Sequence, residues 1–340
     1  MTTNDTHWRT QLLARLGAER SYLLRQFWGL DEHTLSTIPV TDDWTAKDIL
    51  AHIAFWDGLA TERLSRMVNG RIHELTAVGD PTTIEATNRD RHTQFKELPL
   101  ETTLAMLLKE RSGFHTLLNR IADHDLHRRL RLGDGHRTRP RTWANGRWRH
   151  DAHHAQALAT WRQALPDDIK NKRLGPKYIL RALLQTTRKE FLSTADLIPQ
   201  SERTRQPVCG VWTLKDLIGH LTDWEKVGLE GLQQLANNQT PEFNDTIDFP
   251  FDAFNNANAA ARQDQSWDEV WADFTTTRQQ FLTQFDAMSD EQLTRQFTAP
   301  WQRPINGYFW LTIWLGHDHE HALDVRASLA LPNWPQRLKH

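Results

Sequence analysis

The sequence predicts an all-α protein built from two tandem four-helix bundles, each with a long crossover connection between its second and third helices. Three observations favour this fold. A 14-residue stretch beginning at Trp44 recurs from Trp212, 168 residues later, and this separation is close to half of the 340-residue chain. Apolar residues recur every three or four positions along most of the chain. No useful length alternates apolar and polar residues, so we expect almost no sheet.

The repeated stretch has the features of a helix N-terminus. In each copy a threonine is followed three residues later by an aspartate, which is a capping-box pattern: the hydroxyl and the carboxylate satisfy backbone amides at the start of a helix. An apolar stripe then continues in both copies. The recurring residues are Trp44, Thr45, Lys47, Asp48, His52 and Trp56, matched by Trp212, Thr213, Lys215, Asp216, His220 and Trp224. The chain is therefore a tandem duplication.

The first half contains five predicted helices, of which four are long and apolar on one face. The first precedes Gly29, a residue type that commonly ends helices. The second is the capped helix of the repeat. The third segment is polar but compatible with a helix, and it belongs to the crossover connection. The predicted ranges are 8–27, 49–67, 83–95, 101–121 and 143–161.

A polar stretch punctuated by prolines, residues 165–176, predicts a linker between the halves. We therefore expect one bundle over residues 1–164 and the other over residues 177–335. The second half repeats the order of the first, and its predicted helices cover residues 177–197, 213–235, 251–262, 267–288 and 308–329. Asn88 and Arg111 match Asn255 and Arg278 at a separation of 167, so one insertion or deletion lies in the connection.

Composition excludes several classes of protein. The single cysteine, Cys209, excludes an internal disulfide framework, a thiolate zinc site and a two-cysteine redox motif, so nitrogen and oxygen must hold any metal. A net charge of −2 favours no particular partner. No apolar run is long enough to span a bilayer, and the first five residues lack the features of a signal peptide. We expect a soluble, cytoplasmic protein with no membrane partner.

Histidines that recur at the duplication spacing form a candidate metal site in each half. Two of them stand four residues apart on the last helix, which places their imidazoles about 6 Å apart along one helix face. The third comes from the capped helix. One histidine on an apolar stripe is usually a hydrogen-bonded core residue, but three that recur together favour a shared site. The candidate ligands are His52, His150 and His154, and His220, His317 and His321.

Carboxylates and other histidines lie near these ligands in the sequence. Asp57 and Glu225 follow the capped-helix histidines by five residues; they are candidates for proton transfer, with a solvated carboxylate as the commoner alternative. Asp151 and Asp318 point about 100° away from the neighbouring ligand, which predicts contacts to a ligand or to solvent. We expect His153 and His319 at the surface.

Tryptophans are unusually frequent, with 15 in the chain. Wide aromatic side chains suit either a well-filled core or the wall of a pocket for an organic ligand. Both alternatives stay open at this stage. The tryptophans nearest the histidines in sequence or in register are the candidate pocket residues Trp56, Trp143, Trp224 and Trp310.

An arginine-rich segment before His150 is the main asymmetry between the halves, because the equivalent part of the second half has only Arg295 and Arg303. A run of charge is commonly a solvated face. The alternative is a clamp for an anionic substrate or a thiol carboxylate, with Arg147 and Arg149 as its candidates. Nucleic-acid binding is disfavoured, because the chain as a whole is not basic.

The pattern Trp-Thr-x-Lys-Asp-x-x-x-His-x-x-x-Trp, followed far downstream by His-x-x-x-His, resembles the DinB-like superfamily of four-helix bundles, which includes YfiT-type proteins and mycothiol or bacillithiol transferases. The resemblance covers nearly the whole chain as two copies. Residues 252–255 and 266–270 also resemble the ClbS/DfsB branch, some of whose members detoxify a reactive natural product. The resemblance implies a three-histidine site for a divalent metal, zinc or nickel, in each bundle.

Two hypotheses for function remain open. The first is a metal-dependent thiol transferase or hydrolase that acts on an electrophilic small molecule, with a thiol as candidate cosubstrate. The second is a non-catalytic protein that binds metal or sequesters a ligand. A duplicated chain can also pack its halves as a pseudo-twofold pair.

Overall fold

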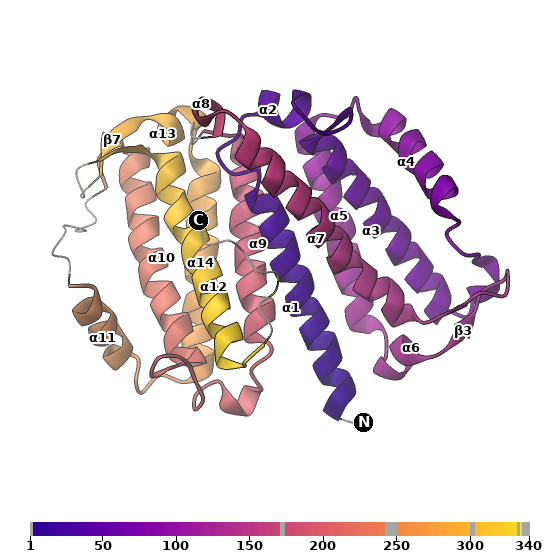
Figure 1. Ribbon diagram of the computed structural model, residues 1–340. Coiled ribbons are helices and arrows are strands. Elements are labelled where there is room, and N and C mark those ends of the chain that lie inside the picture. Colours follow the sequence, from indigo (N-terminus) through magenta and orange to yellow (C-terminus); the bar gives the residue numbers. More distant parts are fainter. Residues whose placement is uncertain (1–2, 171–173, 242–249, 300–302, 332–333, 335–340) are drawn as a thin grey trace. The chain divides into compact units, whose positions relative to one another are not determined.

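Helices account for nearly all regular structure in the computed structural model, which describes residues 3–170, 174–241, 250–299, 303–331 and 334. Strands in these ranges form only two-stranded hairpins (Figure 1). The predicted all-α class is therefore confirmed. The chain divides into two compact units, within residues 1–186 and 187–333, and the boundary falls inside α9 (Lys177–Ala195). Of the predicted linker, residues 167–170 form the short helix α8 (Asp167–Lys170), and residues 171–173 lie outside the described ranges.

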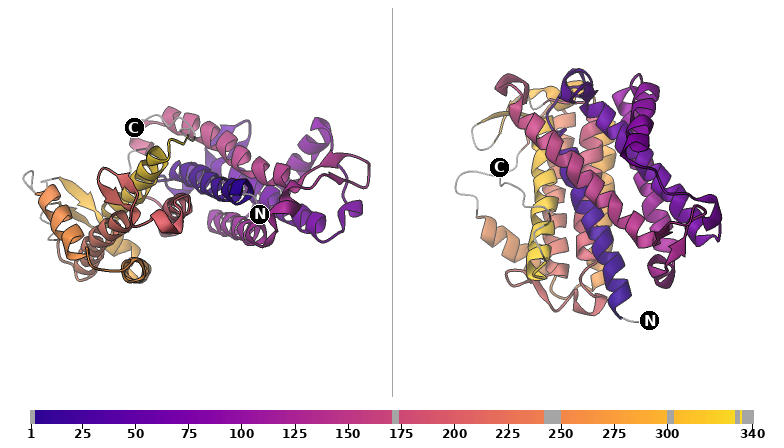
Figure 2. Two further views of the ribbon diagram at one scale, coloured as in Figure 1. Left: turned by 90° about the horizontal axis from the view of Figure 1, so that it is seen from below. Right: turned by 45° about the vertical axis from the view of Figure 1, so that its right-hand side comes forward.

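Four long helices build the first unit: α1 (Thr3–Arg25), α3 (Ala46–Val68), α5 (Leu100–Arg120) and α7 (Pro140–Ala164). Helix α3 packs against α5 and α7, and α1 packs against α7. The crossover between α3 and α5 contains η1 (Ile72–Glu74) and α4 (Pro81–Phe95), and α4 lies along α3 (Figure 2). The short elements are α2 (Glu32–Thr37), β1 (Pro39–Thr41), β2 (Trp44–Thr45), α6 (Asp123–His127), β3 (Leu130–Arg131) and β4 (Arg137–Thr138).

The second unit repeats this order. Its long helices are the C-terminal part of α9, α10 (Leu214–Ala236), α12 (Trp267–Ala287) and α14 (Gly307–Ser328), and α10 packs against both α12 and α14. Helix α11 (Phe251–Ala261) belongs to the crossover and packs on α10, as α4 packs on α3. The short elements are η2 (Gln200–Glu202), β5 (Pro207–Cys209), β6 (Trp212–Thr213), α13 (Asp290–Thr294), β7 (Gln296–Thr298) and β8 (Pro304–Asn306).

The repeated motif fixes the start of α3 and of α10. Thr45 and Asp48 form a capping box, in which the Thr45 amide donates to Asp48 Oδ2 at 2.9 Å and the Asp48 amide donates to Thr45 Oγ1 at 3.3 Å. Thr213 and Asp216 make the same two bonds at the same distances. These bonds satisfy amides that have no partner within the helix.

The lysine of the motif ties each crossover helix to the helix that the motif begins, α3 or α10. Lys47 Nζ donates to the Lys96 carbonyl at the end of α4, and Lys215 Nζ donates to the Gln263 and Gln265 carbonyls just after α11, at 3.0 and 2.8 Å. A cation is favourable there because carbonyls at a helix C-terminus carry partial negative charge. The motif therefore positions two helices of each unit.

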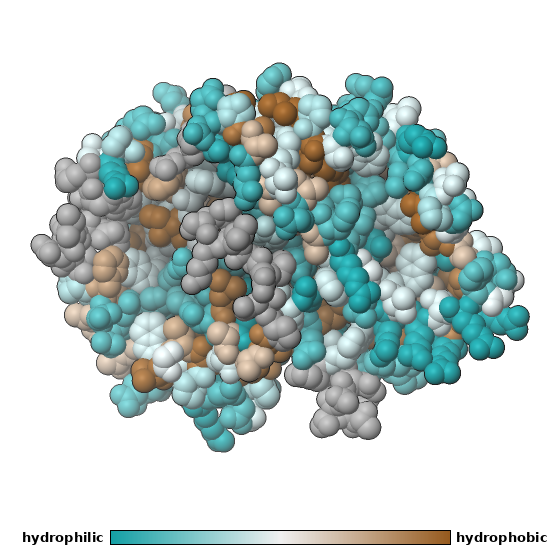
Figure 3. Space-filling view, in the orientation of Figure 1, coloured by the Kyte–Doolittle hydropathy of each residue, from teal (hydrophilic) through white to brown (hydrophobic). Residues whose placement is uncertain are grey.

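Each unit has its own hydrophobic core. Fully buried leucines and Phe114 fill the first, where α1, α3 and α5 meet, and Phe191, Phe274 and Val325 contribute to the second. Figure 3 shows hydrophilic residues gathered over the end of the first unit that carries β3 and α6. Among the described residues, no helix is long and apolar enough to cross a membrane.

Candidate metal centres

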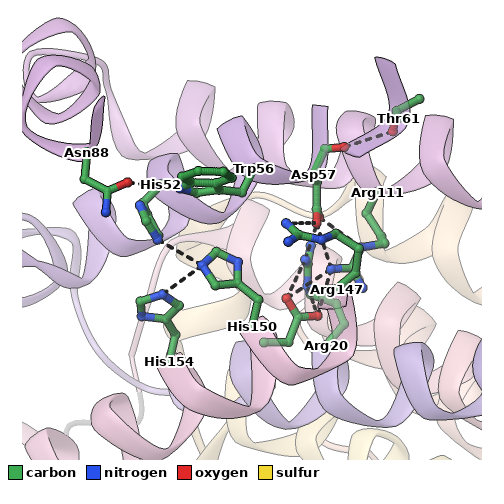
Figure 4. A network of polar contacts seen from close by, with 11 residues as sticks. Arg20, His52, Trp56, Asp57, Thr61, Asn88, Arg111, Arg147, His150 and His154 are labelled. Atoms are coloured by element: carbon green, nitrogen blue, oxygen red, sulfur yellow. Dashed lines mark hydrogen bonds and ion pairs between the residues drawn. The ribbon is translucent and has the colours of Figure 1, made fainter. Parts of the chain in front are cut away.

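The three candidate histidines of the first unit converge (Figure 4). His52 comes from α3, and His150 and His154 come from α7. His150 Nε2 lies 2.9 Å from His52 Nε2 and 3.2 Å from His154 Nε2. Nitrogen ligands about 2.0–2.1 Å from one ion are themselves about 3 Å apart. The spacing of these nitrogens therefore matches three ligands of a single ion.

The second unit builds the same arrangement from α10 and α14. His220 Nε2 lies 2.9 Å from His317 Nε2. The His321 ring completes the group, with its centroid 5.0 Å from that of His220 and 4.7 Å from that of His317. One ligand atom from each of the three residues lies within 4.8 Å of the others. Both units thus bring together the three histidines that the sequence indicates.

The charge state of these rings suits a metal. Burial, together with the neighbouring histidines, lowers the pKa of His52 and of His220 to about 3. Burial lowers the pKa of His154 to about 4, and it holds the pKa of His150 and His317 well below the usual value. These rings are therefore neutral at neutral pH, and each offers one nitrogen with a lone pair, as a metal ligand must. The donor set fits zinc or nickel.

Outer contacts orient two rings of the second triad. Asp324 Oδ2 accepts a hydrogen bond from His321 Nδ1 at 2.8 Å, and this bond is the main reason that the pKa of Asp324 is lowered. The Asn255 side chain hydrogen-bonds His220 and also accepts from Trp224 Nε1 at 3.0 Å. With Nδ1 of His321 donating, its Nε2 lone pair faces the other histidines. Such contacts hold a ligand in place before an ion binds.

Cys209 extends this chain of contacts. Its Sγ donates to Asp324 Oδ2 at 3.4 Å. Burial and the Asp324 carboxylate raise the pKa of the Cys209 thiol to about 11, so the sulfur remains protonated and acts as a hydrogen-bond donor. In the first half, Thr41 and Ala157 occupy the positions of Cys209 and Asp324. The outer contacts of the two triads therefore differ.

A buried network of charges lies beside each triad. In the first unit Asp57 and Asp151 are both fully buried. Arg111 donates to Asp57 at 2.9 Å and to Asp151 at 3.0 Å, and Arg20 bridges the same two carboxylates at 2.9 and 3.0 Å. Burial alone raises the pKa of Asp57, but the two arginines outweigh it and lower the pKa overall. The network joins α1, α3, α5 and α7.

The second unit has an equivalent network. Arg188 donates to Asp318 at 3.0 Å and to Glu225 at 3.1 Å, and Arg278 pairs with the same two acids. Glu225 is fully buried and Asp318 is 1% exposed. The expectation that Asp57 and Glu225 are solvated is therefore wrong. The arginines recur at the duplication spacing, as the acids do, and this recurrence is the signal by which the sequence could have revealed the network.

The candidate pocket tryptophans fall into two groups. Trp56 and Trp224 lie beside the triads, with ring centroids 6.3 Å from His52 and 6.4 Å from His220. Trp143 and Trp310, which correspond by position, pack with the hydrophobic cores instead. Trp143 is half-buried against the first core, with the guanidinium carbon of Arg63 4.5 Å from its ring centroid, and Trp310 is fully buried.

Two tryptophans that were not candidates also contact the triads. Trp44 lies 5.4 Å from His52 and Trp212 lies 4.8 Å from His220, measured between ring centroids. A small pocket between α3 and α4 opens beside His52 and is lined in part by Trp44, Asn88 and His92.

The remaining candidates have mixed outcomes. His153 is exposed, as expected. His319 is 9% exposed and its Nδ1 lies 3.1 Å from the buried Glu190 carboxylate, so the expectation that it lies at the surface is wrong. Arg149 is exposed and its guanidinium lies 5.1 Å from the Trp148 ring centroid. Arg147, in contrast, is buried next to the charge network.

Comparison with known proteins identifies the family. The family model of the DinB superfamily matches residues 15–158 and again residues 183–325. A search of curated proteins and a search of solved structures find no match. The two matched regions cover most of the chain, and each contains one histidine triad and one arginine–carboxylate network. The chain therefore belongs to the DinB superfamily and contains two tandem copies of its domain.

Proposed function

We propose that the protein is a metal-dependent enzyme, a thiol transferase or a hydrolase, that acts on an electrophilic small molecule. In this proposal His52, His150 and His154 hold one divalent ion, zinc or nickel, and His220, His317 and His321 hold another. The supporting observation is the convergence of neutral imidazole nitrogens in both units, at separations of 2.9–3.2 Å where they are closest. Three such ligands leave at least one coordination position open to a substrate.

The ion would supply Lewis-acid activation of water or of a thiol cosubstrate. The chain supplies binding and orientation. Trp44 and Trp56 flank His52, and Asn88 holds the Trp56 indole through a 3.1 Å hydrogen bond, so an apolar wall lies next to the ligands. In the second unit Asp324, with a side chain 41% exposed, is the carboxylate placed to accept a proton near the triad.

The alternative is a non-catalytic protein that binds metal or sequesters a ligand. One observation favours it. Asp57 and Glu225, the carboxylates considered for proton transfer, are held by arginines in the interior and offer no free base. The two functions share the same ligands, so only a measurement of turnover separates them.

The test is turnover by metal-loaded protein. Metal-free protein is loaded with zinc or nickel, metal content is measured, and the protein is incubated with thiols and a panel of electrophiles. We expect turnover that His52→Ala and His220→Ala reduce together with metal content, whereas His153→Ala, a change at an exposed neighbour, leaves both unchanged. Stoichiometric binding of metal or electrophile without turnover would support the alternative. No metal uptake by either triad would refute the metal-dependent function, and no binding of either metal or electrophile would refute both.

A further inference from the structure

Arg147 is a buried cation whose hydrogen bonds are incomplete. It lies on α7 one turn before His150 and is 9% exposed. Its Nε and Nη1 are enclosed and have no hydrogen-bond partner among the described residues. Asp57 Oδ1, a carboxylate oxygen of the network, lies 3.9 Å from Nη1, beyond hydrogen-bond distance. The chain therefore leaves donors of this guanidinium unused.

The charge network does not neutralise Arg147. Arg20 and Arg111 already bind both oxygens of Asp57 and of Asp151. Three guanidinium groups thus share two carboxylates, and one positive charge has no counterpart in the network. Burial lowers the pKa of Arg147, but a guanidinium remains charged at neutral pH. A buried charge that its surroundings do not balance is costly, and a bound anion offsets that cost.

The second unit shows that the fold does not require this charge. Trp314 stands at the equivalent position, and its Nε1 donates to the Trp224 carbonyl at 2.8 Å. Gly228 makes room for the indole, since a Cβ there would lie 2.3 Å from it. Two arginines and two carboxylates balance in that network. A four-helix bundle of this kind can therefore form without an arginine at the position of Arg147.

Arg147 also acts on the first triad. Figure 4 shows it grouped with Asp57 and Arg111 on one side of His150, with His52 and His154 on the other. Its charge contributes to the lowered pKa of His52 and of His150. A divalent ion on the triad would add two more positive charges to the same region, so an anion is the ligand that this region favours.

We infer that Arg147 forms an oxyanion-binding position beside the first triad, which takes a carboxylate or phosphate group, and that Trp314 removes this position from the second unit. A guanidinium binds both kinds of oxyanion through paired N–H donors. The inference rests on the proposed function, because it names the class of ligand that the first site takes. The anion is either a free ion or a group on the substrate.

The test measures anion binding and needs no turnover. Inorganic phosphate and acetate are titrated by calorimetry into metal-free and zinc-loaded full-length protein. We expect one phosphate per chain, with affinity reduced about tenfold or more in Arg147→Met, as expected for loss of a hydrogen-bonded charge. Methionine avoids the contact that tryptophan would make with Ala60, the residue at the position of Gly228. Arg129→Met removes an exposed arginine of the same unit and should leave the affinity unchanged.

The outcomes of these titrations decide the inference. Equal anion affinity in Arg147→Met and the parent, or no binding of either anion to the parent, overturns it. Binding of phosphate alone assigns the position to a free ion or a phosphate ester, and binding of acetate assigns it to carboxylates. The metal-free titration separates the two proposals. If zinc or nickel loading gives no metal uptake but Arg147-dependent anion binding persists, the role of Arg147 is supported and the metal-dependent function is refuted. Circular dichroism verifies that the Arg147→Met variant is folded.

Discussion

The two bundles bring three histidines together from the same helix positions but surround them differently. In the second, Asp324 and Asn255 orient ligand rings, and the charge network is balanced. In the first, Ala157 stands in place of Asp324, and Arg147 adds an unbalanced positive charge. The duplication has therefore kept the three histidines and the buried acids while changing the contacts around them. We expect the second triad to bind a divalent ion more tightly than the first.

The largest difference between the two units should be the loss of unfolding free energy when one acid of the charge network is removed. Asp57→Ala leaves three arginines with one carboxylate, whereas Glu225→Ala leaves two with one. Removing one partner of a buried ion pair costs about 3–5 kcal/mol, and we expect Asp57→Ala to lie at the upper end because it leaves the larger excess charge. Urea unfolding followed by tryptophan fluorescence measures the free energy, with Asp90→Ala, at a mostly exposed side chain, as control. A loss below about 1 kcal/mol for Asp57→Ala would contradict the network.

The next effect is on metal affinity. Asp324→Ala should weaken zinc binding by the second triad about 10- to 100-fold, because His321 loses the partner that fixes its orientation. The measurement is chelator competition in a His52→Ala background, in which the first triad is disabled. Ala157→Asp, tested in a His220→Ala background, should tighten binding by the first triad. Unchanged affinity in both variants would show that the outer contacts do not set the difference.

Acid should destabilise the metal-free protein. The pKa of His52 and of His220 is about 3 in the folded chain and about 6.5 when unfolded, so the unfolded state binds more protons below pH 6.5. Stability is therefore fully present above about pH 6.5 and decreases as the pH falls towards 3, by up to about 2 kcal/mol for each ring at pH 5.

His52→Gln and His220→Gln should each reduce the loss of stability in acid by a similar amount, since the two rings have the same pKa of about 3 in the folded chain. Urea midpoints between pH 4.5 and pH 7.5 report the change. Unequal reductions would show that the pKa values of His52 and His220 in the folded chain are not alike.

The smallest expected effect is the loss of stability when a helix cap is removed, and it should be equal in the two units. Thr45→Ala and Thr213→Ala each remove the hydroxyl of a capping box and should cost about 1 kcal/mol. Hydrogen exchange of the first-turn amides of α3 and α10 measures each cost separately. A clear difference between the two variants would mean that the shared motif is not equivalent in the two copies.

The sequence by itself determined the duplication, the helices and the six candidate ligands. Each follows from local chemistry: Thr45 caps a helix through the amide three residues away, and His150 with His154 share a helix face because of the α-helical period. Conserved spacing between the copies then joined His52 and His220 to these pairs.

Only the tertiary structure decided which charges are buried. Periodicity gives the direction of Asp57 around α3, but its partners, Arg20 and Arg111, lie 37 and 54 residues away on other helices. Without them a carboxylate at that position is expected in solvent, because an unpaired buried charge is unfavourable. His319 was misplaced for the same reason, since Glu190 lies 129 residues away. Burial of a polar side chain depends on a partner that the packing of helices supplies, and no local pattern encodes that packing.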